Sequence, residues 1–237
     1  MSSNYRNIPK AIWSFVRAEF VLVASLAVIA TALLGFIEIA DEMAEGESHG
    51  FDMAVLQALH PDPANPSDPI GPFWVDHAAA DLTALGSLAV LATIALLAGG
   101  FLVLERKRLE AGMIAIAFVG GLALSQSLKE FFGRERPPEI YRASDILNAS
   151  FPSGHALLSA VVFLTLGAML AQASKGRALR IFIMCAAIAL VLIVGLTRIY
   201  LGVHWTTDVL AGWSVGAAWA TLCWLAGSWL KQRPRPS

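Results

Sequence analysis

Long apolar stretches separated by short polar segments dominate the pattern of the chain. Six stretches reach or approach the length of about 20 mostly apolar residues that a helix needs to cross a bilayer. They cover residues 20–39, 82–104, 112–128, 157–173, 181–201 and 209–230. The third and fourth are short for a span, but six such runs in one chain argue against a soluble helical domain. The pattern predicts an all-α protein built as a six-transmembrane helix bundle.

Composition supports the same class. Of the 237 residues, 57% are hydrophobic and 15% charged, whereas a typical soluble domain is about half apolar and a quarter charged. We expect residues 1–237 to form a single integral membrane domain. The formal net charge of −1 argues against a nucleic-acid partner, because such domains are usually strongly basic. Cys185 and Cys223 lie inside apolar runs and are interpreted as small hydrophobic residues.

The first apolar run has two interpretations. Arg6, Lys10 and Arg17 precede it, as basic residues precede the apolar region of a signal peptide. The run is longer than the ~7–15 apolar residues usual in such peptides, and no clear cleavage site follows it. We therefore favour a retained helix, and removal of this run would leave the orientation of the other five unchanged.

Basic residues are divided unevenly between the two alternating sets of connecting segments. Twelve of the seventeen lie in one set: Arg6, Lys10, Arg17, Arg106, Lys107, Arg108, Lys175, Arg177, Arg180, Lys231, Arg233 and Arg235. Short cytoplasmic segments of membrane proteins carry such an excess. We therefore expect both termini in the cytoplasm and a multi-pass protein of the cytoplasmic (inner) membrane. Segments 41–81, 129–156 and 202–208 would then face the periplasm or exterior.

The first outer segment, residues 41–81, is long and acidic. Its stretch 60–72 is rich in proline, which is typical of irregular loops. Residues 51–59 have the pattern of a short amphipathic helix at the membrane interface. We favour a solvated connector over that alternative.

Most of the outer basic residues lie at the ends of apolar runs, together with two histidines and a carboxylate. Charges near a membrane are costly, so they mark candidate functional sites. They occur in three patterns: Lys-x6-Arg-Pro from Lys129 through Arg136, Pro-Ser-Gly-His with Ser153, Gly154 and His155, and Arg-x5-His-x3-Asp with Arg198, His204 and Asp208. All three belong to outer segments, which places them on one face of the membrane. Arg134 and Arg142 hold no position in these patterns and are interpreted as solvated loop charges.

The residue types suit phosphate chemistry. A phosphate monoester carries two negative charges, and Lys129, Arg136 and Arg198 would supply fixed cations, with arginine able to donate two parallel hydrogen bonds. Ser153 is a good helix N-cap, and Gly154 lets the backbone approach closely. A helix that begins there directs free N–H groups and the positive end of its dipole at an anion.

The two histidines suit nucleophilic catalysis. His204 and Asp208 are four residues apart, so at a helix start they share one face. A carboxylate bonded to one ring nitrogen fixes the tautomer and leaves the other nitrogen free to attack, forming a phosphohistidine intermediate. His155, in the first turn of its helix, is the expected general acid for the leaving group and general base for water.

Together the three patterns resemble the signature of the type 2 phosphatidic acid phosphatase (PAP2) superfamily. That superfamily includes bacterial lipid phosphatases, undecaprenyl-pyrophosphate phosphatases, glucose-6-phosphatase and vanadium haloperoxidases. The patterns cover residues 129–208, the motif-bearing core, and Thr197 departs from the serine that many members have before the arginine. The resemblance implies a membrane phosphatase with His204 as nucleophile, His155 as acid and base, and neither metal nor cofactor. No outer carboxylate cluster in the sequence resembles a magnesium site.

The expected partners are a lipid phosphate or prenyl pyrophosphate substrate and the surrounding membrane lipid. Two other functions stay open. A lipid-to-lipid phosphotransferase would use the same residues, with the hydroxyl or phosphate of a second lipid in place of water. A transporter of anionic lipids or phosphate would also contain intramembrane cations, but it would hold them deep within the spans rather than at one edge.

Overall fold

The computed structural model describes residues 8–142 and 148–232, and the side chains of residues 19–142 and 148–231. Within these ranges the chain is helical and forms no strand. Of the basic residues used for orientation, Arg6, Arg233 and Arg235 lie outside the described residues, as do the side chains of Lys10 and Arg17. In chain order the elements are α1 (Ile8–Glu45), α2 (Ser48–Leu59), α3 (Phe73–Ala84), α4 (Leu88–Leu104), α5 (Arg108–Phe132), the 3-10 helix η1 (Glu139–Tyr141), α6 (Gly154–Ala173), α7 (Arg177–Tyr200) and α8 (Thr206–Gln232).

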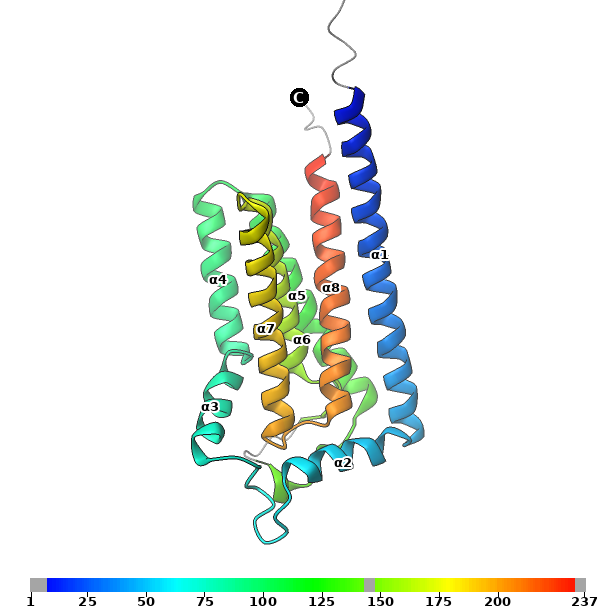
Figure 1. Cartoon of the computed structure of the whole chain (residues 1–237), viewed down its shortest axis with the longest axis vertical. Helices are drawn as coiled ribbons and strands as arrows, with labels where there is room; N and C mark the ends of the chain where they lie inside the picture. Colours follow the sequence, from blue (N-terminus) through cyan, green and yellow to red (C-terminus); the bar gives the residue numbers. More distant parts are fainter. Residues whose placement is uncertain (1–7, 143–147, 233–237) are drawn as a thin grey trace, which may run out of the picture.

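The long helices stand side by side around α6 (Figure 1). α6 packs against α4, α5, α7 and α8, while α1 packs against α8 and α4 against α5. The two ends of the described chain and the α4–α5 and α6–α7 connections lie at one end of the bundle (Figure 1). α2 and α3 lie at the other end, with the connections before α6 and α8. The alternating segments predicted from the basic residues therefore do gather at two opposite ends.

Five helices are long and apolar enough to cross a membrane individually. They are α1 (through its part Glu19–Glu45), α5, α6, α7 and α8. α3 and α4 meet the same criteria only as a pair, with a bend of 46° between them. The chain is thus an integral membrane protein whose described part is all-helical, with five such helices, or six if the bent pair forms one span.

The predicted continuous helix over 82–104 is wrong, because the chain breaks at residues 85–87. Two features lie at the break. A Cβ on Gly86 would lie 2.3 Å from Cγ1 of Val194 and 3.2 Å from the ring of His155, so only glycine permits this approach. The hydroxyl of Ser87 then caps α4 by accepting a hydrogen bond from the N–H of Val90 at 3.3 Å.

The preference for a solvated connector over a short helix at residues 51–59 is also wrong. α2 lies across the end of the bundle (Figure 1) and contacts α1, α7 and α8. Ser48, Asp52 and Leu56 are buried, and their spacing of four residues places them on one helix face. Periodicity therefore identified a helix in this region, and the proline-rich stretch 60–72 is irregular, as predicted.

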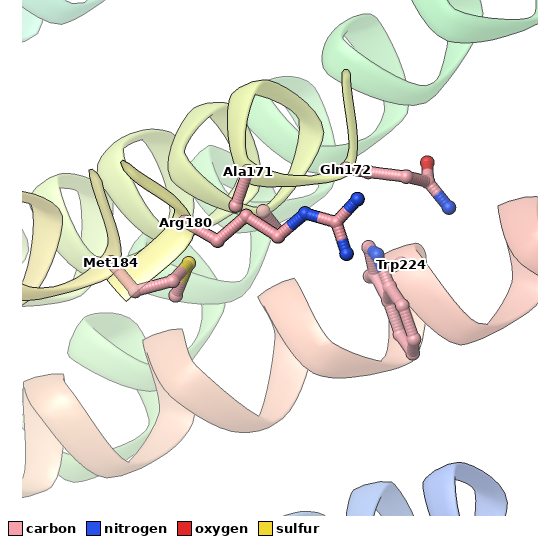
Figure 2. Close-up of a pocket in the computed structure, with 6 residues that line it drawn as sticks. Ala171, Gln172, Arg180, Met184 and Trp224 are labelled. Carbon is pink, nitrogen blue, oxygen red and sulfur yellow. The ribbon is translucent and has the colours of Figure 1, made fainter. Parts of the chain in front are cut away.

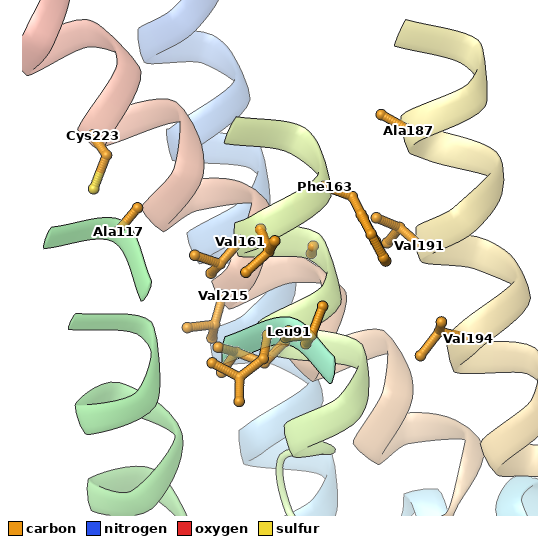
Figure 3. Close-up of a cluster of buried hydrophobic side chains, with 13 residues drawn as sticks. Leu91, Ala117, Val161, Phe163, Ala187, Val191, Val194, Val215 and Cys223 are labelled. Carbon is orange, nitrogen blue, oxygen red and sulfur yellow. The ribbon is translucent and has the colours of Figure 1, made fainter. Parts of the chain in front are cut away.

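The apolar core lies between α6 and its neighbours (Figure 3). It contains Leu157 and Val161 of α6, Leu91 of α4, Val194 of α7 and Val215 of α8, all buried. Side chains on the outer faces of the helices are also apolar but exposed, including Leu97, Phe101, Phe182 and Leu196. Such a large exposed apolar surface is what a lipid environment requires.

Candidate active site

A cavity of about 200 Å³ lies at the end of the bundle where α5 and α7 finish and α6 begins. Its apolar lining consists of Leu88, Leu122 and Leu158. The remainder is strongly polar. Six of the eight predicted site residues line it: Lys129, Arg136, Gly154, His155, Arg198 and His204. The other two, Ser153 and Asp208, are fully buried next to it.

The cations Lys129 and Arg136 are fixed mainly by backbone oxygens. Lys129 is buried in the last turn of α5, and its ammonium donates to the carbonyls of Ala149 and Ser150. Arg136 donates from Nε to the carbonyl of Asn148 at 2.9 Å and from Nη2 to the side-chain oxygen of Asn148 at 2.6 Å. Burial lowers the pKa of Arg136 to about 10, so this guanidinium is still charged at neutral pH.

The third cation retains an unused donor. Arg198 is buried in the last turn of α7 and donates from Nη1 to the hydroxyl of Thr83 at 3.2 Å. Its Nε is buried and has no hydrogen-bond partner within the described part of the chain. Buried donors are almost always paired, so an N–H held unpaired at a cavity wall is suited to a bound anion.

His204 presents the lone pair of a ring nitrogen to these cations. Its Nδ1 lies 3.2 Å from Oδ2 of Asp208, and its Nε2 lies 3.1 Å from Nη1 of Arg136. Arginine can only donate, so we assign the proton of the ring to Nδ1 and the lone pair to Nε2. Burial lowers the pKa of His204 well below its usual range, and the charges of Arg136 and Arg198 lower it further. The ring is therefore neutral at pH 7, which is the nucleophilic form.

Asp208 is held by four groups. Its Oδ1 accepts from Nη1 of Arg134 at 2.7 Å. Its Oδ2 accepts from the N–H of Trp205 at 3.0 Å and from the hydroxyl of Ser150, and it contacts Nδ1 of His204. The carboxylate that orients the histidine is thus itself fixed in position.

The start of α6 forms another side of the cavity. The hydroxyl of Ser153 caps the helix by accepting from the N–H of Ala156 at 3.5 Å, and the N–H of Ser153 donates to the carbonyl of Asp208 at 2.9 Å. A Cβ on Gly154 would lie 3.3 Å from the hydroxyl of Ser125. The first turn of α6, which contains His155, therefore lies at the cavity, and the positive end of the helix dipole lies there with it.

Sequence reasoning missed several residues of this site. The hydroxyl of Ser150 lies 3.3 Å from Nδ1 of His204, and Asn148 and Thr83 accept from Arg136 and Arg198 as described above. They lie in connecting segments or on a helix far away in the sequence, and no spacing rule connects them to the motifs.

Two interpretations of loop charges are wrong. The side chain of Arg134 is only 11% exposed and pairs with the carboxylates of Asp52 and Asp208. That of Arg142 is 15% exposed and donates from Nε to the carbonyl of Pro137 at 2.6 Å. Both were interpreted as solvated because they hold no motif position, but buried acceptors lie within their reach.

Two further observations distinguish this cavity from other regions of the molecule. The described residues contain no group of three or more His, Cys, Asp and Glu side chains arranged for a metal ion. At the opposite end of the bundle, a hollow of about 470 Å³ lies between α6, α7 and α8 (Figure 2). Its lining includes Arg180 and Trp224 but neither a histidine nor a carboxylate. The cavity with His204 is therefore the candidate active site.

Its components define a class of protein: an integral membrane protein with a cavity at one end of its helical bundle, where three cations surround a buried neutral histidine. Sequence comparison agrees. The model of the PAP2 superfamily matches residues 110–232, which is more than half of the chain. The chain belongs to the PAP2 superfamily.

Two curated relatives are similar over part of their length. Phosphatidylglycerophosphatase B of Bacillus subtilis (strain 168) is 31% identical over 150 residues, which is 60% of this chain and 70% of the relative. Undecaprenyl-diphosphatase of Sulfolobus acidocaldarius is 30% identical over 121 residues, which is 49% of this chain and 54% of that relative.

Solved structures show the same fold. The crystal structure of a transmembrane PAP2-type phosphatidylglycerolphosphate phosphatase from Bacillus subtilis superposes with a TM-score of 0.76 at 24% identity, covering 88% of this chain and 98% of that one. The structure of Aquifex aeolicus LpxE superposes with a TM-score of 0.54 at 22% identity, covering 73% and 94%. The expectation of an all-helical PAP2-type membrane protein is confirmed.

Proposed function

We propose that the protein hydrolyses a lipid phosphate or lipid diphosphate through a phosphohistidine on His204, without a metal ion. The observation that carries this proposal is the pairing of Nδ1 of His204 with Asp208 while Nε2 stays at the cavity wall beside Arg136. The names of the two curated relatives, a phosphatidylglycerophosphatase and an undecaprenyl-diphosphatase, support a lipid substrate. So do the leucines that line the cavity together with the cations, because they offer apolar contacts to a lipid tail.

The first step transfers the phosphoryl group to the enzyme. The lone pair of Nε2 attacks phosphorus, and a nitrogen–phosphorus bond forms as the bond from phosphorus to the leaving oxygen breaks. Lys129, Arg136 and Arg198 stabilise the negative charge on the transferring group. The bound dianion favours the protonated form of His155, which gives its proton to the leaving oxygen.

The second step releases phosphate. His155, now neutral, takes a proton from water as the water oxygen attacks phosphorus. The nitrogen–phosphorus bond breaks, and its electron pair returns to Nε2. Throughout both steps Asp208 accepts a hydrogen bond from Nδ1–H of His204, and its negative charge balances the positive charge of the phosphorylated ring.

We further propose that the bent pair α3–α4 forms a sixth span. The protein would lie in the cytoplasmic membrane with both termini in the cytoplasm. The cavity would then face the periplasm or exterior. The excess of basic residues at the opposite end of the bundle supports this orientation. Single cysteines introduced as Ser67→Cys and Lys175→Cys in a background without Cys185 and Cys223 test it. Only the first should react with a membrane-impermeant maleimide on intact cells, and the reverse pattern would exclude this orientation.

The activity is tested by phosphate release from a panel of lipid phosphates and prenyl diphosphates in detergent with excess EDTA. Wild type should release phosphate and incorporate labelled phosphate in an acid-labile, alkali-stable form. His204→Ala should do neither. His77→Ala, which removes an exposed histidine of α3 at the same end of the bundle, should do both. Full activity of His204→Ala, or loss of activity in EDTA that magnesium restores, would contradict the mechanism.

A further inference from the structure

Arg134 joins two carboxylates that come from distant parts of the chain. It donates from Nη2 to Oδ2 of Asp52 at 2.8 Å and from Nη1 to Oδ1 of Asp208 at 2.7 Å. The side chains of both acids are fully buried, and the guanidinium lies over the ring of Trp205, 5.6 Å from its centroid. Two buried carboxylates thus share one cation, which compensates part of the cost of removing them from water.

Thr207 closes this group of residues into a ring. Its N–H donates to Oδ1 of Asp52 at 3.0 Å, and its hydroxyl donates to Oδ2 of Asp52 at 2.6 Å. The same hydroxyl accepts from Nη1 of Arg134 at 2.8 Å. Asp52, Arg134, Thr207 and Asp208 form what we call the Asp52 network, and it connects α2 of the first outer segment to the first turn of α8.

The Asp52 network determines which oxygen of Asp208 is available to His204. Because Arg134 occupies Oδ1, the oxygen that remains for Nδ1 of His204 is Oδ2, which also accepts from Ser150 and Trp205. Without Arg134, Oδ1 would be buried without a partner, and rotation of the carboxylate would be less restricted. The contact that fixes the histidine tautomer therefore depends on a salt bridge located behind it.

Neither Asp52 nor Arg134 lines the phosphate-binding cavity. We propose that both are positioning residues for catalysis: Asp52 of α2 orients Arg134, Arg134 orients Asp208, and Asp208 holds His204 with its Nε2 lone pair toward phosphorus. This proposal rests on the function proposed above. It makes the outer segment part of the catalytic apparatus, and it predicts an effect on turnover rather than on phosphate binding.

The first test is Asp52→Asn, which retains the shape of the side chain but not its charge. Loss of a charge-assisted hydrogen bond should lower kcat by about ten- to a hundredfold, with KM and inhibition by inorganic phosphate changed by less than about threefold. Glu47→Gln is the matched control, because it makes the same chemical change at an exposed residue just before α2. Equal kcat in the two variants would overturn the proposal, as would a rise in KM without a fall in kcat.

A second pair of variants applies if Asp52→Asn does not fold. Thr207→Val removes the hydroxyl from the network, whereas Thr207→Ser retains it. Turnover should fall about tenfold in the first and recover in the second. Similar turnover in both variants would overturn the proposal.

A spectroscopic readout separates failure of this proposal from failure of the proposed function. In protein labelled with ¹⁵N-histidine, the resonances of His204 are those missing from His204→Gln. Wild type should show Nδ1 protonated and Nε2 unprotonated, and Asp52→Asn should show a mixture of tautomers. If wild type releases no phosphate from any lipid, the proposed function is wrong and the tautomer measurement still decides this inference: an unchanged Nδ1–H signal in Asp52→Asn overturns it.

Discussion

Gly212 of α8 is the position where a single added methyl group should disturb both stability and catalysis. A Cβ there would lie 2.7 Å from the carbonyl oxygen of Ser153, 3.0 Å from Cβ of Ala156 and 3.2 Å from the backbone nitrogen of Leu157. Two of these three atoms belong to the backbone at the start of α6, so no side-chain rotation can relieve the contacts. Gly212→Ala must therefore move the first turn of α6 away from α8.

The expected size follows from two opposing effects. Overpacking of a tight contact costs about 1–3 kcal/mol, and replacement of glycine by alanine within a helix returns up to about 1 kcal/mol. The net loss of stability should be about 1 kcal/mol. His155 lies on the displaced turn, and misplacement of a catalytic group by about 1 Å can cost about a hundredfold in rate. A shift of a few tenths of an ångström should therefore lower kcat by several-fold.

Gly100→Ala in α4 is the matched control, because nothing lies within 4 Å of a Cβ at that position. Thermal unfolding in detergent and phosphate release should be measured for both variants and wild type. Gly212→Ala should unfold at a lower temperature than Gly100→Ala and turn over more slowly. If the two variants have the same unfolding temperature and the kcat of wild type, the helix contact does not constrain the site as argued.

Three further predictions concern other parts of the site. Ser150→Ala removes the hydroxyl that donates to Asp208 and lies 3.3 Å from Nδ1 of His204. The value of kcat should fall about tenfold, and an unchanged kcat would contradict a role of Ser150 in holding these two residues. Burial holds the pKa of His204 far below the value of ~6.5 for a histidine in the unfolded chain. At a pH below ~6.5, His204 therefore takes up a proton when the protein unfolds. The unfolding temperature should therefore decline from pH 7 to pH 5, and less steeply in His204→Gln; equal slopes would refute this assignment. Inorganic phosphate should raise the unfolding temperature of wild type by binding the folded state, but not that of Arg198→Gln, and a similar rise in both would exclude Arg198 from the binding site.

The helices and the motif residues were predictable because each depends on local pattern. Apolar runs of span length identified the long helices, although α5 and α6 extend several residues beyond the predicted runs 112–128 and 157–173. The ends were missed because polar residues such as Lys129 and Ser153 continue the helix or cap it within the protein. Motif spacing and topology together predicted the residues that the structure brings to one cavity.

The break in the predicted span 82–104 and the role of α2 were not predictable in the same way. Gly86 lies at the break, where Val194 and His155 occupy the space that a side chain would need, and neither is near it in the sequence. In the sequence Asp52 is one of many acids in an acidic segment, and only the folded chain places it beside Thr207 and Arg134. Both features depend on contacts between distant segments, which periodicity does not encode.

The crowding of Lys129, Arg136 and Arg198 around one cavity implies that the resting enzyme is an anion complex. Three cations confined in a small and partly apolar space repel one another, and Asp208 is already paired with Arg134. Any inorganic phosphate in the surroundings relieves this repulsion, so we expect a lipid to enter by exchange with a bound ion rather than by filling an empty cavity. A phosphate head group then gains little over the ion that it displaces. Preference among lipids would instead come from the tail and its contacts with Leu88, Leu122 and Leu158.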